Sequence, residues 1–404
     1  MPSPFRADPL PLALAAGVLF IAAWAGLHAG WYERDQIVDT PVYEGYGNAI
    51  ESGKLPYRDF RLEYPPGALP AFAVPSLVTQ GRAPERYRSA FEGAMVTSGL
   101  AALVFAAFAL RAAGAGPWRA GAALAFAALS PLLLGSVVLS RFDLWPAAAV
   151  AAALAALVAV RPRLGLALLG AAIAIKLYAL VIVPVALAYV WRRAGRRAAL
   201  QAGAIGAGVV GGAYLPFLVL SPDGVAYSLS RQLGRPLQIE SFGSSILLGL
   251  HHTAGLGVEW ASGHGSQNLV GTAPTVVAAV QSVLQLAALV AIWIAFARGP
   301  ATPDRLLRYA AGTLVAFVAL GKVVSPQFLI WLLVPVALVA GRRGIAGAVL
   351  LGAACVLTQL WFPYRYWDLV YEFDGLASTL VLVRNLVLVA LLAVLVVPVR
   401  ASRP

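Results

Sequence analysis

Two aspartates lie four residues apart just after the first apolar segment of this chain, at Asp35 and Asp39. If that stretch is helical, the two carboxylates share a face, and either could act as a general base that deprotonates an acceptor hydroxyl. Both could instead be solvated loop acids or helix caps. Their surroundings favour chemistry, because residues 31–87 hold 8 of the 18 acids of a chain in which 60% of the residues are hydrophobic.

The same segment ends in a stiff stretch. Tyr64 is followed by two prolines, which favour an extended backbone. Asp59 and Glu63 alternate with apolar residues and predict one polar side on this stretch. These residues could line a site or anchor a rigid loop.

Cations lie inside or beside apolar runs elsewhere in the chain. Lys176, Lys322 and Arg384 are each flanked by apolar residues, and a charge at such a position is costly in lipid and therefore a functional candidate. The alternative for Lys176 is that its ammonium reaches the membrane interface. Arg231 and Arg235 share a polar loop, and their guanidinium groups suit phosphate because each can bind two oxygens.

Further polar residues are more ambiguous. Arg141 and Asp143 lie where two apolar segments meet, and could form a local ion pair. Glu240 lies in the same loop as the two arginines. His251 and His252 could be a base or metal ligands, but adjacent histidines do not share a helix face, so no metal site is predicted.

The composition is that of a membrane protein. Mean hydropathy is +0.79 and only 12% of residues are charged, and apolar runs long enough to cross roughly 30 Å of hydrocarbon recur along the chain. The first run, Leu10–Ala29, lacks the flanks of a signal peptide and is predicted to stay as a helix. Cys355 is the single cysteine, which excludes an intramolecular disulfide and a cysteine metal cluster.

The net charge of +12 follows the pattern of a membrane topology rather than of nucleic-acid binding. Alternate loops and the two ends hold 16 basic residues against two acids, whereas the rest of the chain holds 14 basic residues and 16 acids. Basic loops stay in the cytoplasm. Both termini are therefore predicted to be cytoplasmic.

The expected fold is an all-α polytopic bundle of about 12 transmembrane helices in one domain, residues 1–404. The run 164–191 is long for one crossing and has basic flanks at both ends, so it predicts a pair of short helices with Lys176 near their turn. A count of 10 helices plus a re-entrant hairpin is the alternative. The clear spans fall near residues 10–30, 88–111, 120–138, 143–160, 198–220, 274–297, 306–321, 326–341, 344–361 and 379–399.

Three longer loops are predicted to form the outer, active-site face: 31–87, 221–273 and 362–378. Within the first loop, Val42–Ser52 predicts a short helix, and Ala68–Val78 predicts an apolar segment that lies in the membrane interface. The glycine-rich stretch 253–271 is expected to be flexible.

Read together, these motifs resemble the GT-C superfamily of polytopic glycosyltransferases, most closely glycosyltransferase family 87, which includes polyprenyl-phosphate-mannose-dependent mannosyltransferases. The similar motifs follow the family order over almost the whole chain. They are residues 38–43, 53–60 with 63–66, 141–143, 175–178, 235–241 and 322–331. The chain departs from many members at Ala179, where proline is common, which leaves the shape of the hairpin turn open.

The resemblance implies a GT-C-like bundle and an inverting transferase with its catalytic base at Asp39, with Asp35 as second choice. It implies that Lys176, Arg235 and Lys322 bind the donor phosphate, and Arg231 is a further candidate for that role. The other residues expected around the substrates are Tyr43, Asp59, Glu63, Tyr64, Arg141, Asp143, Glu240, His251, His252, Gln327 and Arg384.

The expected activity is transfer of a mannose-type or arabinose-type sugar from polyprenyl phosphate to a lipid-linked or glycan acceptor, outside the cytoplasmic membrane. The expected partners are membrane lipids, this donor and this acceptor, with no nucleic acid and no cofactor, and the chain is expected to be a monomer. The alternative function is a transporter or lipid flippase. Transporters usually hold charges near the midplane and have repeated halves, whereas here the polar residues gather towards one face.

Overall fold

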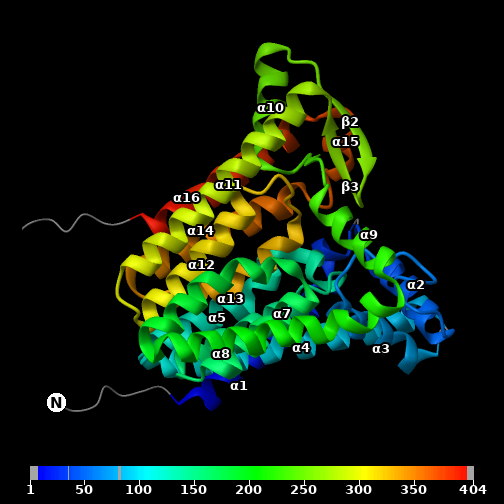
Figure 1. The fold of residues 1–404 in the computed structure, drawn as a ribbon. Helices are drawn as coiled ribbons and strands as arrows, with labels where there is room; N and C mark the ends of the chain where they lie inside the picture. The colour runs from blue at the N-terminus through cyan, green and yellow to red at the C-terminus, as the bar shows by residue number, and fades with distance from the viewer. Residues whose placement is uncertain (1–7, 35, 81–82, 398–404) are drawn as a thin grey trace, which may run out of the picture.

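The computed structural model describes residues 8–34, 36–80 and 83–397, and these fold mainly as α-helices packed side by side (Figure 1). Within these described residues, seven helical segments are long and apolar enough to cross a membrane. Their α-helices are α1 (Pro9–Gly26), α4 (Pro84–Ala112), α5 (Pro117–Leu134), α8 (Val183–Leu220), α11 (Thr272–Arg298), α14 (Gly341–Trp361) and α16 (Gly375–Val396).

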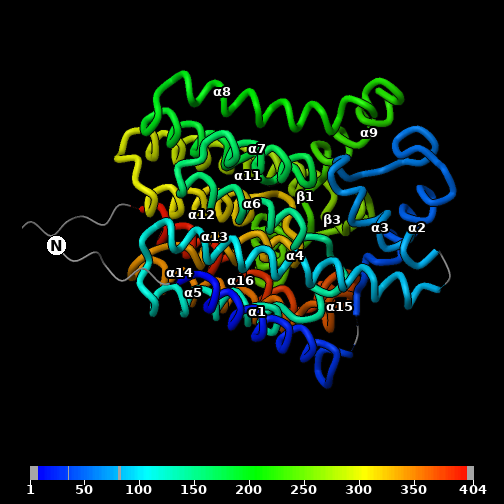
Figure 2. Tube along the Cα trace, turned by 90° about the horizontal axis from the view of Figure 1, so that it is seen from below, coloured from blue at the N-terminus to red at the C-terminus, as the bar shows by residue number. Residues whose placement is uncertain are grey.

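Shorter helices fill the middle of the bundle. The most deeply buried are α6 and α13, in which nearly every residue is apolar and buried, as expected for helices surrounded by other helices. In the tube view α12 and α13 lie between α8 and α1 (Figure 2). The shorter segments are η3 (Gly135–Leu139), α6 (Leu144–Val158), α7 (Pro162–Ile175), η4 (Leu177–Ile182), α12 (Pro303–Ala319), η5 (Pro326–Leu329) and α13 (Ile330–Ala337).

Every predicted membrane span coincides with helical structure, so the expected all-α polytopic class is confirmed. The long run 164–191 breaks at Lys176, whose backbone is extended between α7 and η4. The backbone at the end of α7 approaches Gly67 of the first loop, whereas Arg192 donates to carbonyl oxygens of Ala297 and Gly299 in a basic loop. The chain therefore reverses direction at Lys176, as predicted.

The helix α8 is itself two segments, because Gly195 has a non-helical backbone (φ 84°, ψ 167°). Its second half packs tightly on α7. A Cβ at Gly170 would lie 2.4 Å from the carbonyl oxygen of Gly206, so the two backbones touch where both residues lack side chains. Such small residues let membrane helices approach closely.

The polar loops gather at one end of the bundle, on the right in Figure 1. The predicted short helix is α2, and the predicted interfacial segment is α3, which holds Pro75 within it. The elements at this end are η1 (Gly30–Glu33), α2 (Thr40–Glu51), η2 (Pro66–Ala68), α3 (Leu69–Thr79), α9 (Pro222–Leu233), β1 (Leu237–Gln238), α10 (Phe242–Ala254), β2 (Glu259–Gly263), β3 (Ser266–Val270) and α15 (Tyr366–Glu372).

The expectation of a flexible stretch at 253–271 is wrong. Residues 259–270 form an antiparallel hairpin, β2 and β3, and β3 also pairs with β1, so the strand order is β1-β3-β2. The hairpin turns at His264 and Gly265, both with positive φ. Asn268 holds the turn because its amide donates to the carbonyl oxygen of Gly263 at 2.9 Å. Glycine here closes a turn instead of loosening a linker.

An aromatic cluster fixes the first loop to the bundle. The ring of Tyr43 on α2 stacks on Phe72 of α3 at 4.8 Å between centroids and meets the edge of Phe142 at 5.6 Å. Phe91 of α4 and Tyr64 complete the contacts around Tyr43, at 5.5 Å and 5.9 Å. Aromatic pairs of this kind add stability beyond their buried area, so α2 is held firmly at its first turn, which follows Asp39.

Candidate active site

Asp39 lies immediately before α2, with its carboxylate pointing towards the turn between η3 and α6. Its Oδ1 lies 3.0 Å from Nη1 of Arg141, and its Oδ2 accepts a hydrogen bond of 3.3 Å from the hydroxyl of Tyr43. The side chain of Asp39 is 32% exposed, whereas that of Arg141 is 6% exposed. The carboxylate is thus oriented from its buried side and open to solvent on the other.

Asp143, two residues after Arg141, forms a second charged pair with Lys176. Its Oδ1 accepts from Nζ of Lys176 at 2.6 Å and also from the indole N–H of Trp331. The ammonium also lies 4.4 Å from the ring centroid of Phe142 and 5.2 Å from that of Trp331, positions that favour a cation. The lysine, 15% exposed, is therefore held by one carboxylate and two aromatic faces.

A local ion pair between Arg141 and Asp143 was one expectation for this turn, and it is wrong. The two side chains turn to different partners, Asp39 and Lys176. The turn at 141–143 therefore links the first loop to the Lys176 hairpin. Removing one member of a buried pair leaves the charge of the other member uncompensated.

Two of the predicted phosphate binders share a groove. Arg235 and Lys322 line a cavity of about 300 Å³. The segments that carry them are joined by a backbone hydrogen bond, in which the N–H of Gln238 donates to the carbonyl oxygen of Lys322 at 3.0 Å. The rest of the groove is mainly apolar and runs onto α11: Pro236, Leu237, Leu269, Pro274, Thr275, Ala278, Ala279 and Ser282. Two cations at the head of an apolar groove suit an anionic group attached to a hydrocarbon chain.

Arg231 does not line this groove. Its Nε lies 3.3 Å from Oε1 of Glu63, and neighbouring Gln232 donates to the carbonyl oxygen of Glu63 at 2.8 Å. These contacts fasten α9 to the first loop. Of the two arginines in this segment, Arg235 has the better placement for a phosphate.

Glu240 lies buried between the groove and the last helix. Its backbone oxygen accepts from Arg384 at 2.8 Å and from Asn385 at 3.2 Å, and its Oε1 accepts from the side-chain amide of Gln238 at 3.3 Å. Burial raises the pKa of Glu240 to about 7, although the guanidinium of Arg384, the amide of Gln238 and the guanidinium groups of Arg235 and Arg141 act in the opposite direction. Arg384 is fully buried, so it faces protein as expected.

Other predicted residues have mainly structural contacts. Asp59 pairs with neighbouring Arg58 at 2.8 Å and caps the amide of Leu55, and these hydrogen bonds lower the pKa of Asp59. His251 and His252 bond the carbonyl oxygens of Leu256 and Phe373 at 2.7 and 2.8 Å, respectively.

Tyr64 packs in the aromatic cluster and accepts, at its backbone oxygen, a 2.6 Å hydrogen bond from the hydroxyl of Tyr57. Gln327 is half-buried in η5. Asp35 lies outside the described residues. Within 8–34, 36–80 and 83–397, no three His, Cys, Asp or Glu side chains gather as a metal site.

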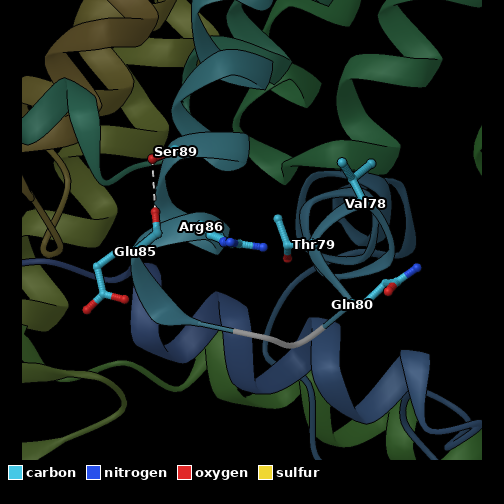
Figure 3. Close-up of a pocket in the computed structure, with 6 residues that line it drawn as sticks. All are labelled: Val78, Thr79, Gln80, Glu85, Arg86 and Ser89. Carbon is cyan, nitrogen blue, oxygen red and sulfur yellow. Dashed lines mark hydrogen bonds between the residues drawn. The ribbon is translucent and has the colours of Figure 1, made fainter.

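The interpretation of the sequence missed Trp331 and Gln238. Trp331 shares the carboxylate of Asp143 with Lys176, and Gln238 connects Glu240 to Ser325 at 3.0 Å. The signal that could have found them is that both lie in the motifs that carry the family resemblance, residues 235–241 and 322–331. A separate crevice of about 440 Å³ between the ends of α3 and α4 contains none of the predicted residues (Figure 3).

The fold and this site define a multi-pass membrane protein with an oriented carboxylate and several buried or part-buried cations at one end of a helical bundle. The model of glycosyltransferase family 87 matches residues 62–326. The chain belongs to glycosyltransferase family 87, and it is therefore a membrane glycosyltransferase. No curated protein sequence matches the chain.

Solved structures also resemble the chain. The crystal structure of ArnT from Cupriavidus metallidurans bound to undecaprenyl phosphate superposes with a TM-score of 0.50 at 15% identity, over 96% of this chain and 76% of that one. The oligosaccharyltransferase of Archaeoglobus fulgidus has a TM-score of 0.40 at 12% identity, over 96% of this chain and 54% of that one. The similarity to ArnT agrees with the predicted GT-C fold.

Proposed function

We propose that this protein is an inverting glycosyltransferase that moves a mannose-type or arabinose-type sugar from polyprenyl phosphate to a lipid-linked or glycan acceptor. The observation that carries the proposal is the placement of Asp39. Arg141 and Tyr43 orient its carboxylate while about a third of the side chain remains accessible. A positioned and accessible carboxylate is what removal of a proton from an incoming hydroxyl requires.

In the proposed reaction the acceptor oxygen attacks the anomeric carbon of the donor sugar, and Asp39 takes the proton of the acceptor hydroxyl. The bond between the anomeric carbon and the phosphate oxygen breaks, and the bonding electrons leave with the phosphate. The departing phosphate gains negative charge, which cations fixed in advance would stabilise. Arg235 and Lys322 are proposed for this role, because they line the same groove.

The apolar wall of that groove supports a lipid-linked donor. ArnT, whose fold is similar, was crystallised with undecaprenyl phosphate. Lys176 is proposed to act with these cations, although Asp143 already neutralises part of its charge. We propose that the site faces outward from the cytoplasmic membrane and that both termini lie in the cytoplasm. The loops rich in basic residues stay in the cytoplasm, and the site is formed by other loops.

The test is sugar transfer by purified, folded protein carrying Asp39→Asn or Asp39→Ala. Loss of a general base is expected to lower kcat by about 10²–10⁴-fold. The matched control is Glu51→Gln, which changes an exposed acid at the end of the same helix and should leave kcat near the wild-type value. Wild-type turnover in Asp39→Asn would contradict the assignment and make Asp35 the next residue to test.

A further inference from the structure

A second polar cavity takes no part in the chemistry described so far. It has a volume of about 480 Å³ and is lined by His28, Glu33, Gln36 and Arg88. The first three residues lie between α1 and α2, and Arg88 lies near the start of α4. The cavity is therefore at the polar end of the bundle, beside the segment that leads into Asp39.

One carboxylate, that of Glu92, holds two of the four lining residues, His28 and Arg88. The side chain of Glu92 is only 11% exposed; its Oε1 lies 2.9 Å from Nε of Arg88 and its Oε2 lies 3.0 Å from Nε2 of His28. Arg88 in turn donates to Oε1 of Gln36 at 2.8 Å, and Gln36 donates to the carbonyl oxygen of Tyr32 at 3.2 Å. Because His28 and Arg88 remain 45% and 39% exposed, oriented polar groups face the cavity.

The cavity and Asp39 share their supports. Gln36 precedes Asp39 by three residues in one non-helical segment. On α4, Phe91 is next to Glu92, and its ring contacts that of Tyr43 at 5.5 Å, while the hydroxyl of Tyr43 binds Asp39. These supports connect the cavity to the segment that carries Asp39.

The cavity is also built from different elements than the groove of Arg235 and Lys322. That groove uses β1, β3 and α11, and α1 and α11 lie on different sides of α4 and α13 in the tube view (Figure 2). Inverting transfer needs the acceptor hydroxyl and the departing phosphate on opposite faces of the sugar. Two separate sites built from different elements are compatible with that requirement.

We propose that the cavity of His28, Glu33, Gln36 and Arg88 is the acceptor subsite, and that it binds the hydroxyl groups of a neutral glycan. This inference rests on the proposed transferase function. Sugar hydroxyls donate and accept hydrogen bonds, and the carboxylate, amide and guanidinium groups here offer both kinds of partner. Two carboxylates, Glu33 and Glu92, accompany one guanidinium and one imidazole, a balance that disfavours phosphate.

The test is direct binding of two probes to the full-length protein in detergent, measured by saturation-transfer NMR. The probes are mannobiose, a neutral disaccharide, and mannose 6-phosphate, an anionic sugar. Wild-type protein should bind mannobiose more tightly than mannose 6-phosphate. Gln36→Ala and Glu33→Gln should each weaken mannobiose binding about five- to tenfold, the effect of one lost hydrogen bond.

The matched control is Arg86→Ala, which removes an arginine of the same helix that lines the crevice in Figure 3 and should leave mannobiose binding unchanged. Thermal unfolding of each variant reports whether it has folded. Equal mannobiose binding in the wild type and in both folded cavity variants would overturn the proposal, as would absent binding in the wild type or tighter binding of mannose 6-phosphate.

Transfer kinetics separate this inference from the proposed function. If wild-type protein transfers sugar, Gln36→Ala should raise the KM for the acceptor while the KM for the donor stays unchanged, a pattern of lost acceptor binding. An unchanged acceptor KM would overturn the acceptor subsite and leave the transferase assignment intact. Absence of transfer by wild-type protein would count against the transferase, while mannobiose binding would still test the cavity.

Discussion

Oδ1 of Asp39 lies 3.0 Å from Nη1 of Arg141, and the guanidinium is almost wholly buried while the carboxylate is partly open. An arginine holds a carboxylate through a planar group of fixed geometry. The pairing therefore restricts the direction in which the free side of the carboxylate points. A base that takes the proton of one hydroxyl must point towards that hydroxyl, so the orientation of the carboxylate matters as much as its presence in the site.

The first prediction concerns this pair. Arg141→Gln should lower kcat by about 10²-fold, because a base displaced by roughly 1 Å loses that much, and both KM values should change little. The measurement is steady-state transfer at varied donor and acceptor concentrations. Arg58→Gln is the control, since Arg58 forms an exposed pair with Asp59 in the same loop. A wild-type kcat in Arg141→Gln would show that Asp39 needs no such support.

The second prediction concerns the buried pair of Asp143 and Lys176. Asp143→Asn leaves the ammonium without its carboxylate and should destabilise the protein by about 3–5 kcal/mol. Adding Lys176→Met should restore part of this loss, because the unpaired charge is then absent. The measurement is the unfolding temperature in detergent at one fixed heating rate.

The control for that experiment is the more exposed pair of Arg119 and Asp304, 27% and 55% exposed. Breaking it with Asp304→Asn should change stability by only about 0–1 kcal/mol. Equal effects of Asp143→Asn and Asp304→Asn on the unfolding temperature would show that the pair of Asp143 and Lys176 stabilises the protein no more than an exposed pair does.

The third prediction compares the two arginines of one loop. Arg235→Ala should raise the donor KM about tenfold or more, the effect of losing a charged hydrogen bond to phosphate. Arg231→Ala should have a smaller effect on the donor, because Arg231 already pairs with Glu63. Inhibition by added undecaprenyl phosphate should weaken in the same order. A larger effect at Arg231 would reverse this assignment.

The fourth prediction is a pH dependence of stability. Burial raises the pKa of Glu240 from 4.5 to about 7, so between these values the folded protein binds more protons at this site than the unfolded chain does. Stability contributed by this group should therefore fall as the pH rises from about 4.5 to 7. Glu240→Gln removes the titration and should flatten the decline in unfolding temperature.

Histidines also titrate in that range, and the chain has 4 of them. They are present in both proteins, so the difference between the wild-type and Glu240→Gln curves isolates the carboxyl group. Parallel curves would mean that Glu240 does not titrate between these pH values in the folded protein.

Much of the fold could be predicted from the sequence because membrane helices are a local property. Each must remain apolar over a span of roughly 20 residues, and the basic flanks of 164–191 were enough to indicate the reversal at Lys176. The hairpin of β2 and β3 could not be predicted in this way. Its strands depend on pairing with each other and with β1, and glycines at a turn look the same in a sequence as glycines in a linker.

The sequence by itself determined the class of protein and the kinds of residue that its site could use, because a charge in an apolar run is rare and costly. Only the tertiary structure decided which of these side chains pair with one another. Arg141 binds Asp39 instead of its near neighbour Asp143, and Asp143 binds Lys176 and Trp331. These pairs join segments far apart in the chain, so their geometry depends on how the helices pack.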